Sequence, residues 1–149
     1  MSTKQNSPVV HAHLSFEGRC EEAIDFYRQA LGAEVIMLMR FKENPDPPAP
    51  GCQPPASENK VMHARIRIGD TVLMVSDGRC AGKPSFQGFT ISLTVPSESE
   101  VDRLCNALAN GGQVQMPPAK TFFSPRFGMV ADRFGLVWML LVTPTELRR

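Results

Sequence analysis

The fold is decided by the stretch Phe127-Gly-Met-Val-Ala-Asp-Arg-Phe-Gly-Leu-Val-Trp-Met-Leu-Leu-Val142, which joins the most apolar run of the sequence to a very short turn. The apolar residues on both sides predict two strands. Asp132 and Gly135 are typical of the turn, because one accepts hydrogen bonds from turn amides and the other tolerates positive φ. A strand as apolar as Val137–Val142 is expected to be covered on both faces, or to lie with one face on helices and the other lining a closed cavity. Trp138, the only tryptophan, is expected in the core, with a ligand platform as the alternative.

Length and composition restrict the class of protein. The 149 residues fit one compact domain or two small modules, and 42% hydrophobic residues are enough to form a core. A formal net charge of +1 argues against nucleic-acid and membrane-surface partners. No apolar run approaches the length of a membrane span, and the polar start of the chain lacks the apolar core of a signal peptide, so a cytoplasmic location is predicted. The cysteines show neither zinc-site nor disulfide spacing and are expected to be free thiols; they are Cys20, Cys52, Cys80 and Cys105.

The first half of the chain predicts a strand, a helix and three strands. Residues 9–16 alternate with period two, and the polar face of this strand carries His11 and His13, which either grip a metal or are exposed or hydrogen-bonded. Acids at the start, an apolar face and a closing glycine predict a helix over 20–31. The three further strands are expected at 33–41, 61–68 and 71–76.

A long loop is predicted between the second and third strands. Residues 42–58 hold six of the thirteen prolines and show no periodicity. Such a segment is either a lid over a site or a disordered stretch without function.

The second half repeats the same order. A linker over 78–87 precedes a strand at 88–95, and a capping-box pattern from Ser97 to Glu100 opens a helix over 98–109. A short strand begins at Val114, a loop follows at 116–124, and the closing hairpin completes the set. The halves form an internal repeat of about 75 residues, far longer than the units of solenoid proteins. We therefore predict an α+β fold with two βαβββ modules, residues 9–77 and 88–142, whose curved mixed sheets carry their helices on the outside.

Four segments resemble those of a known group of proteins: Phe16-Glu-Gly-Arg-Cys-Glu-Glu-Ala-Ile-Asp-Phe-Tyr27, Lys60-Val-Met-His-Ala-Arg65, Ser76-Asp77 and Arg126-Phe-Gly-Met-Val-Ala-Asp-Arg-Phe-Gly-Leu-Val-Trp-Met139. The chain is similar to the vicinal oxygen chelate superfamily of glyoxalases, bleomycin resistance proteins and extradiol dioxygenases, within it to the PhnB-like branch. This resemblance implies paired βαβββ modules, commonly in a homodimer, and a cleft that holds a divalent metal in the catalytic relatives. Phe123 and Ser15 depart from the branch, where tryptophan and asparagine are usual.

The resemblance also shows where metal ligands would stand. His11 matches the first ligand position, but Thr90 stands at its equivalent in the second half, and the last strands offer Val72–Ser76 and Met139 where catalytic relatives have glutamate. Thioether and hydroxyl groups are poor ligands for Zn²⁺, Ni²⁺ or Mn²⁺. No metal or other cofactor is therefore predicted; if a divalent metal binds, His11 is the best candidate ligand, with His13 and His63 as possible additions.

The predicted function is the binding of a small organic molecule, without a catalytic metal. The alternative is a metal-dependent lyase, isomerase or dioxygenase with an atypical ligand set. The sequence shows no P-loop, no nucleophile elbow and no Gly-rich turn between a strand and a helix for a nucleotide-like cofactor. Asp77 is predicted to be a turn cap or a pocket carboxylate. The ligand cavity is expected to be closed by the loop 42–58 and bounded by His11, His13, His63, Met74, Thr90, Phe123 and Met139.

Overall fold

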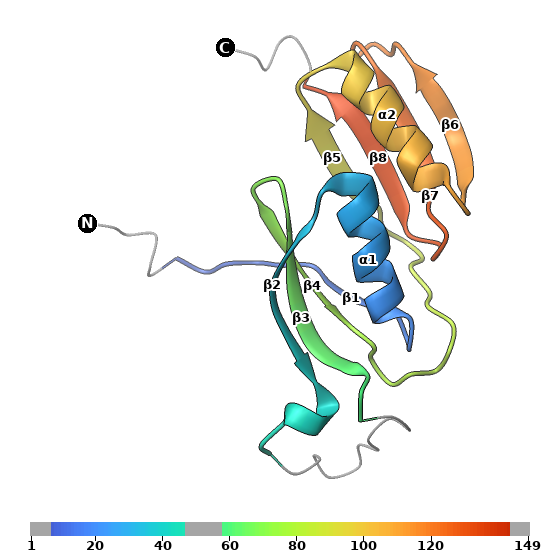
Figure 1. The fold of residues 1–149 in the computed structure, drawn as a ribbon. Coiled ribbons are helices and arrows are strands. Elements are labelled where there is room, and N and C mark those ends of the chain that lie inside the picture. Colours follow the sequence, from blue (N-terminus) through green and yellow to red (C-terminus); the bar gives the residue numbers. More distant parts are fainter. Residues whose placement is uncertain (1–6, 47–57, 144–149) are drawn as a thin grey trace. The chain divides into compact units, whose positions relative to one another are not determined.

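The computed structural model describes residues 7–46 and 58–143. The helices and strands follow the predicted order, a strand, a helix and three strands, in each half of the chain (Figure 1). They are β1 (His13–Ser15), α1 (Cys20–Leu31), β2 (Glu34–Arg40), the 3₁₀ turn η2 (Phe41–Glu43), β3 (Val61–Ile68), β4 (Thr71–Ser76), β5 (Ile91–Val95), α2 (Glu98–Ala109), β6 (Gln113–Ala119), β7 (Phe127–Ala131) and β8 (Val137–Val142).

The strands form two mixed four-stranded sheets with the same topology. Their orders are β1-β4-β3-β2 and β5-β8-β7-β6. In each sheet the first strand of the repeat runs parallel to the last, and the remaining pairs are antiparallel. The predicted α+β class with two βαβββ modules is therefore confirmed.

The chain divides into two compact units, each of which contains one sheet. The first unit is Met1–Ile24 with Ala33–Gly82, and the second is Asp25–Gly32 with Lys83–Arg149. Helix α1 thus contributes its first turns to one unit and its remainder to the other. The predicted module bounds, 9–77 and 88–142, stay predictions.

In the first unit, the sheet has one buried face and one open face. The buried face carries Leu14, Ala64, Ile66, Leu73 and Val75, all at most 5% exposed. Because side chains alternate along a strand, the residues between them point to the open face. Gly69 and Asp70 join β3 to β4 in a two-residue turn, and the positive φ of Gly69 (58°) suits this tight connection. His13 on β1 and His63 on β3, two of the predicted site residues, lie on this open face.

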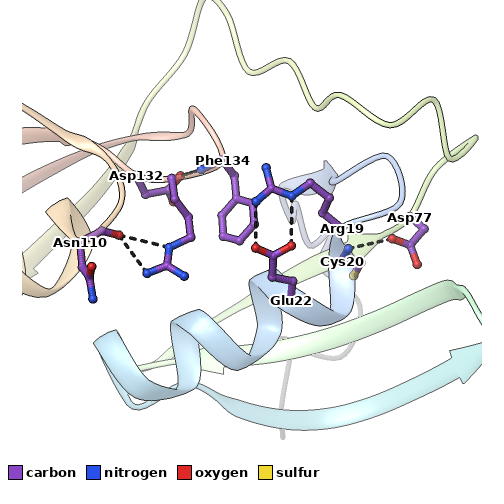
Figure 2. A network of polar contacts seen from close by, with 8 residues as sticks. Arg19, Cys20, Glu22, Asp77, Asn110, Asp132 and Phe134 are labelled. Atoms are coloured by element: carbon purple, nitrogen blue, oxygen red, sulfur yellow. Dashed lines mark hydrogen bonds and ion pairs between the residues drawn. The ribbon is translucent and has the colours of Figure 1, made fainter.

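A buried aspartate connects three segments of the first unit. Asp77, 1% exposed, accepts a hydrogen bond on Oδ1 from the backbone amide of Cys20 (2.7 Å) and on Oδ2 from that of Val61 (2.6 Å). Figure 2 shows the first of these bonds, at the start of α1. The carboxylate accepts a hydrogen bond from an amide that the helix leaves unpaired, and its negative charge interacts favourably with the positive end of the helix dipole. Asp77 is therefore a cap, of helix α1 rather than of a turn.

In the second unit, helix α2 covers one face of its sheet. Val101, Leu104, Cys105 and Leu108, the predicted apolar face, are buried. The Oγ of Ser97 accepts a hydrogen bond from the amide of Glu100 (3.3 Å), so this half of the predicted capping box is confirmed. The helix and the sheet together bury the alternate residues of β8, namely Trp138, Leu140 and Val142.

A second buried aspartate organises the closing hairpin. Asp132, 3% exposed, accepts hydrogen bonds from the amides of Phe134 (2.8 Å) and Leu136 (3.1 Å), as predicted for the turn. It also accepts hydrogen bonds from Trp138 Nε1 (2.9 Å) and the hydroxyl of Tyr27, which belongs to the part of α1 in this unit. Burial and the charge of Asp132 raise the pKa of Tyr27, so its hydroxyl keeps its proton. Trp138 is 1% exposed, which confirms the core prediction.

Three predicted strands differ from the observed ones by three residues or more. Strand β1 covers only His13–Ser15 of the predicted 9–16, and Val9 and Val10 are exposed. Strand β5 begins at Ile91 rather than at residue 88. Strand β6 covers Gln113–Ala119, although a loop was predicted from residue 116. Strand β6 lies at the edge of its sheet. Proline is tolerated at an edge because a backbone position that faces away from the sheet does not need an N–H group to form a hydrogen bond.

Two further predictions fall partly outside the described residues. Of the predicted loop 42–58, residues 47–57 are not described, and Phe41–Glu43 is the 3₁₀ turn η2. Cys20, Cys80 and Cys105 are free thiols, whereas Cys52 lies outside the described residues. None of the helices in the described ranges has the length and apolar character needed to cross a membrane.

We predict that Asp132→Ala lowers the free energy of unfolding by about 3–5 kcal/mol, because it leaves the buried polar hydrogens of Tyr27 and Trp138 without their acceptor. Urea denaturation followed by tryptophan fluorescence and by circular dichroism measures this change. The matched control is Asp70→Ala at the exposed β3–β4 turn, for which we expect a change under about 0.5 kcal/mol. A loss below about 1 kcal/mol for Asp132→Ala would contradict the role of its carboxylate.

Candidate functional site

The open face of the first sheet brings two predicted site histidines together. The ring centroids of His13 and His63 lie 6.1 Å apart, with the planes tilted by 59°. They approach each other because β1 and β3 both pair with β4, one on each side, so only one strand separates the two histidines. Met74 is the partner of His13 on one side and of Arg65 on the other, so these side chains share a face.

A buried serine holds the imidazole of His13. The His13 Nε2 and Ser76 Oγ atoms lie 3.1 Å apart, and Ser76 is 3% exposed. The Oγ also accepts a hydrogen bond from the amide of Gly78 (3.1 Å), which leaves the serine proton free for the imidazole. Gly78 must be glycine here: its φ is 55°, and a Cβ would lie 1.9 Å from Ser15 Oγ.

Ser15 and Glu17 form a polar pair at the end of β1. The hydroxyl of Ser15 donates to the carboxylate of Glu17, which also accepts a hydrogen bond from the amide of Ala81 (3.0 Å). The hydrogen bond from Ser15 is the largest cause of the lowered pKa of Glu17, and the charge of Arg79 acts in the same direction. The charge of this carboxylate is thus compensated by its own neighbours.

His11 is exposed and has one backbone partner. Its Nδ1 lies 3.1 Å from the carbonyl oxygen of Val72. Because a carbonyl can only accept, this contact requires the proton on Nδ1 and leaves Nε2 as the nitrogen available to a ligand.

The environment of His63 favours its neutral form. Burial lowers the pKa of the imidazole below its ordinary value of 6.5, and the nearby charges of His13 and Arg65 lower it further. His63 therefore acts at neutral pH as an uncharged donor and acceptor of hydrogen bonds.

In the second unit, two other predicted site residues bond to each other. The hydroxyl of Thr90 donates to the Sδ of Met139 (3.3 Å). Met139 pairs across the sheet with Met129 on one side and Ser92 on the other. Phe123 packs edge-on against Phe127, with 5.1 Å between the ring centroids. This open face is therefore mostly apolar.

The seven predicted site residues divide between the units. The first carries His11, His13, His63 and Met74, and the second carries Thr90, Phe123 and Met139. That they bound one cavity stays a prediction. Sequence reasoning missed Ser76 and Arg65 as site residues, although the period-two pattern of β3 already placed Arg65 on the face of His63.

The donor set does not match a divalent metal. Within residues 7–46 and 58–143, no group of three or more His, Cys, Asp or Glu side chains could hold such an ion. The hydroxyl of Thr90 and the thioether of Met139 already satisfy each other, and neither carries the charge that a divalent ion needs. The residues at the family's ligand positions thus do not fit the metal of the catalytic relatives.

Comparison with known proteins gives consistent matches over most of the chain. The model of the Glyoxalase/Bleomycin resistance protein/Dioxygenase superfamily matches residues 10–140. Protein YjdN of Escherichia coli is 35% identical over 139 residues, which cover 90% of this chain and 95% of that protein.

Solved structures also match. Protein PA1353 from Pseudomonas aeruginosa has a TM-score of 0.77 at 39% identity, covering 92% of this chain and 98% of that one. A PhnB protein from Bacillus cereus, described as a putative 3-demethylubiquinone-9 3-methyltransferase, has a TM-score of 0.74 at 27% identity, with 91% and 100% covered.

We predict that His63→Gln makes stability less sensitive to acid. A pKa that is lower in the folded than in the unfolded state means that the unfolded chain binds more protons, so the free energy of unfolding falls as the pH drops below the unfolded value of 6.5. Glutamine does not titrate and removes this contribution. Urea denaturation of both proteins at about pH 7.5 and about pH 5 measures the two losses. An equal loss in both proteins would contradict the prediction.

Proposed function

The chain belongs to the Glyoxalase/Bleomycin resistance protein/Dioxygenase superfamily, and we propose that within it the protein binds a small organic molecule without using a catalytic metal. The observation that carries this proposal is the hydrogen bond from Thr90 to Met139. These residues stand at two positions where the resemblance to catalytic relatives would place metal ligands. Because the two side chains bond to each other, these positions present an uncharged, polarisable surface instead of the charged and imidazole ligands expected in catalytic relatives.

The open face of the second sheet supports an organic ligand. It carries Val137, Met139 and Leu141 on β8 and Met129 on β7, all partly exposed. Methionine adapts its shape to a bound group, and apolar linings provide most of the contact area in small-molecule sites. We propose that Met139 and Phe123 contact the apolar part of a ligand bound on this face and that Thr90 lies at its edge.

The open face of the first sheet supplies polar groups. His13 is oriented by Ser76, and His11 presents Nε2 because its Nδ1 faces a carbonyl oxygen. We propose that these imidazoles and that of His63 hydrogen-bond the polar part of a ligand bound on this face, with Met74 between them as apolar lining. Methyl transfer, which the name of the B. cereus protein suggests, is not part of the proposal, because the sequence lacks a Gly-rich turn between a strand and a helix.

The alternative is a metal-dependent lyase, isomerase or dioxygenase. The observation that favours it is the 6.1 Å separation of the His13 and His63 rings, since two adjacent imidazoles can act as ligands of Zn²⁺, Ni²⁺ or Mn²⁺. Such a site would need oxygen or nitrogen ligands beyond these two.

We predict that protein purified without chelator or affinity-tag metal contains far less than one equivalent of Zn, Ni or Mn per chain. Elemental analysis by mass spectrometry measures the content, and thermal unfolding with and without EDTA measures dependence on metal. We expect the same melting temperature in both conditions for the parent protein and for His11→Ala. About one equivalent of metal, lost in His11→Ala, would replace the binding function by the metal-dependent alternative.

We propose further that the protein is a cytoplasmic homodimer. Support comes from the free thiols Cys20, Cys80 and Cys105, which suit a reducing compartment, and from exposed apolar residues on edge strands. Val35 and Ile36 on β2 are 40% and 48% exposed, and Met116 on β6 is 47% exposed.

We predict a mass of about twice 16.4 kDa in light scattering at micromolar concentration. Replacing Ile36 by lysine at the edge of the first sheet tests whether that edge takes part in the dimer, and Ile36→Leu serves as its control. A monomer mass for the parent protein would remove the dimer from the proposal.

A further inference from the structure

Arg65 differs from its neighbour Arg67 in how its charge is compensated. Both lie on β3 and point to the open face of the first sheet. Arg67 pairs with Glu34 on the adjacent strand, with 3.2 Å between Nε and Oε1. Arg65 faces Met37 on one side and Met74 on the other, and neither supplies an acceptor for a guanidinium group.

The contrast extends to other arginines of the described ranges. Carboxylates partner Arg19, Arg28, Arg40, Arg103 and Arg126, as Figure 2 shows for Arg19, and a backbone carbonyl partners Arg133. Arg79 lies close enough to Glu17 to lower its pKa. No ion pair or hydrogen bond of this kind involves Arg65 in residues 7–46 and 58–143.

Two imidazoles lie beside this guanidinium group. His63 precedes Arg65 by two residues on the same strand and therefore shares its face, and His13 lies 6.1 Å from His63. The influence of Arg65 and His13 on the pKa of His63 shows that the three are close enough to interact electrostatically. Glu17, just after β1, is already engaged by Ser15 and Ala81, and Glu34 on β2 is already engaged by Arg67.

We propose that Arg65, His63 and His13 together bind the oxyanion of the ligand, a carboxylate or a phosphate ester. This inference rests on the proposed binding function and names its ligand class. A guanidinium group presents parallel N–H donors that match two oxygens of such a group, and imidazole N–H groups add further donors. Met37 and Met74 flank the guanidinium group and keep competing acceptors away from it, while they offer apolar surface to the adjoining part of the ligand.

The test uses three probes that share a phenyl group: phenyl phosphate, 4-phenylbutyrate and the neutral 4-phenylbutanamide. Isothermal titration calorimetry with the full chain gives the affinity of each probe. We expect at least one anion to bind about tenfold more tightly than the amide, and the stronger of the two identifies the oxyanion as phosphate or carboxylate. Arg65→Gln abolishes this preference, so that the anions and the amide bind with similar affinity, and His63→Gln reduces the preference.

Arg67→Gln is the matched control, because it removes the same charge from the same face of the same strand but from a residue that Glu34 already neutralises. We expect it to retain the preference for the anion. Equal losses in Arg65→Gln and Arg67→Gln, or equal binding of anions and amide by the parent protein, overturn the oxyanion site and leave the binding function standing. Binding of none of the three probes overturns both proposals. Circular dichroism confirms that each variant is folded.

Discussion

The structure of the second unit depends on a charge buried where water cannot reach it. Removing a carboxylate from water is costly unless hydrogen bonds replace its hydration, and Asp132 receives them from two turn amides, an indole and a phenol. These donors come from β8, from the turn and from a helix more than a hundred residues earlier in the chain. Because the donors come from separate segments, the carboxylate joins these segments to one another as well as forming the turn.

The first unit has a corresponding carboxylate in Asp77. Its two oxygens accept hydrogen bonds from the first amide of α1 and the first amide of β3, which fixes the start of a helix and the start of a strand against the end of β4. Each unit therefore contains a buried aspartate that bonds to its own part of α1. The buried carboxylates and apolar cores hold the fold of each unit, whereas the side chains on the open faces take no part in these bonds.

How far the sequence predicts this structure differs between elements. Helices α1 and α2 and strands β3 and β4 have the predicted bounds, because their apolar periodicity agrees with caps and turn residues at both ends. Strand β6 was underestimated because proline is a poor strand residue, and only the sheet order shows that this strand lies at an edge. The proximity of His13 and His63 depends on the pairing of β1 with β4, whose residues are about sixty positions apart. No local pattern encodes that pairing.

The contrast between equivalent positions of the repeat explains how one fold presents two kinds of surface. His13 and Ser92 occupy the same place in their sheets, since each pairs with the methionine of the parallel last strand. In the first unit this position is polar and lies near a guanidinium group, whereas in the second it adjoins an apolar row formed by Met139 and Met129. A metal-dependent relative needs converging anionic or imidazole ligands, but a serine at this position and a thioether beside it provide neither. The chemistry that each open face can support therefore follows from the donor groups it presents, and these groups differ between the two units although the fold of the units is the same.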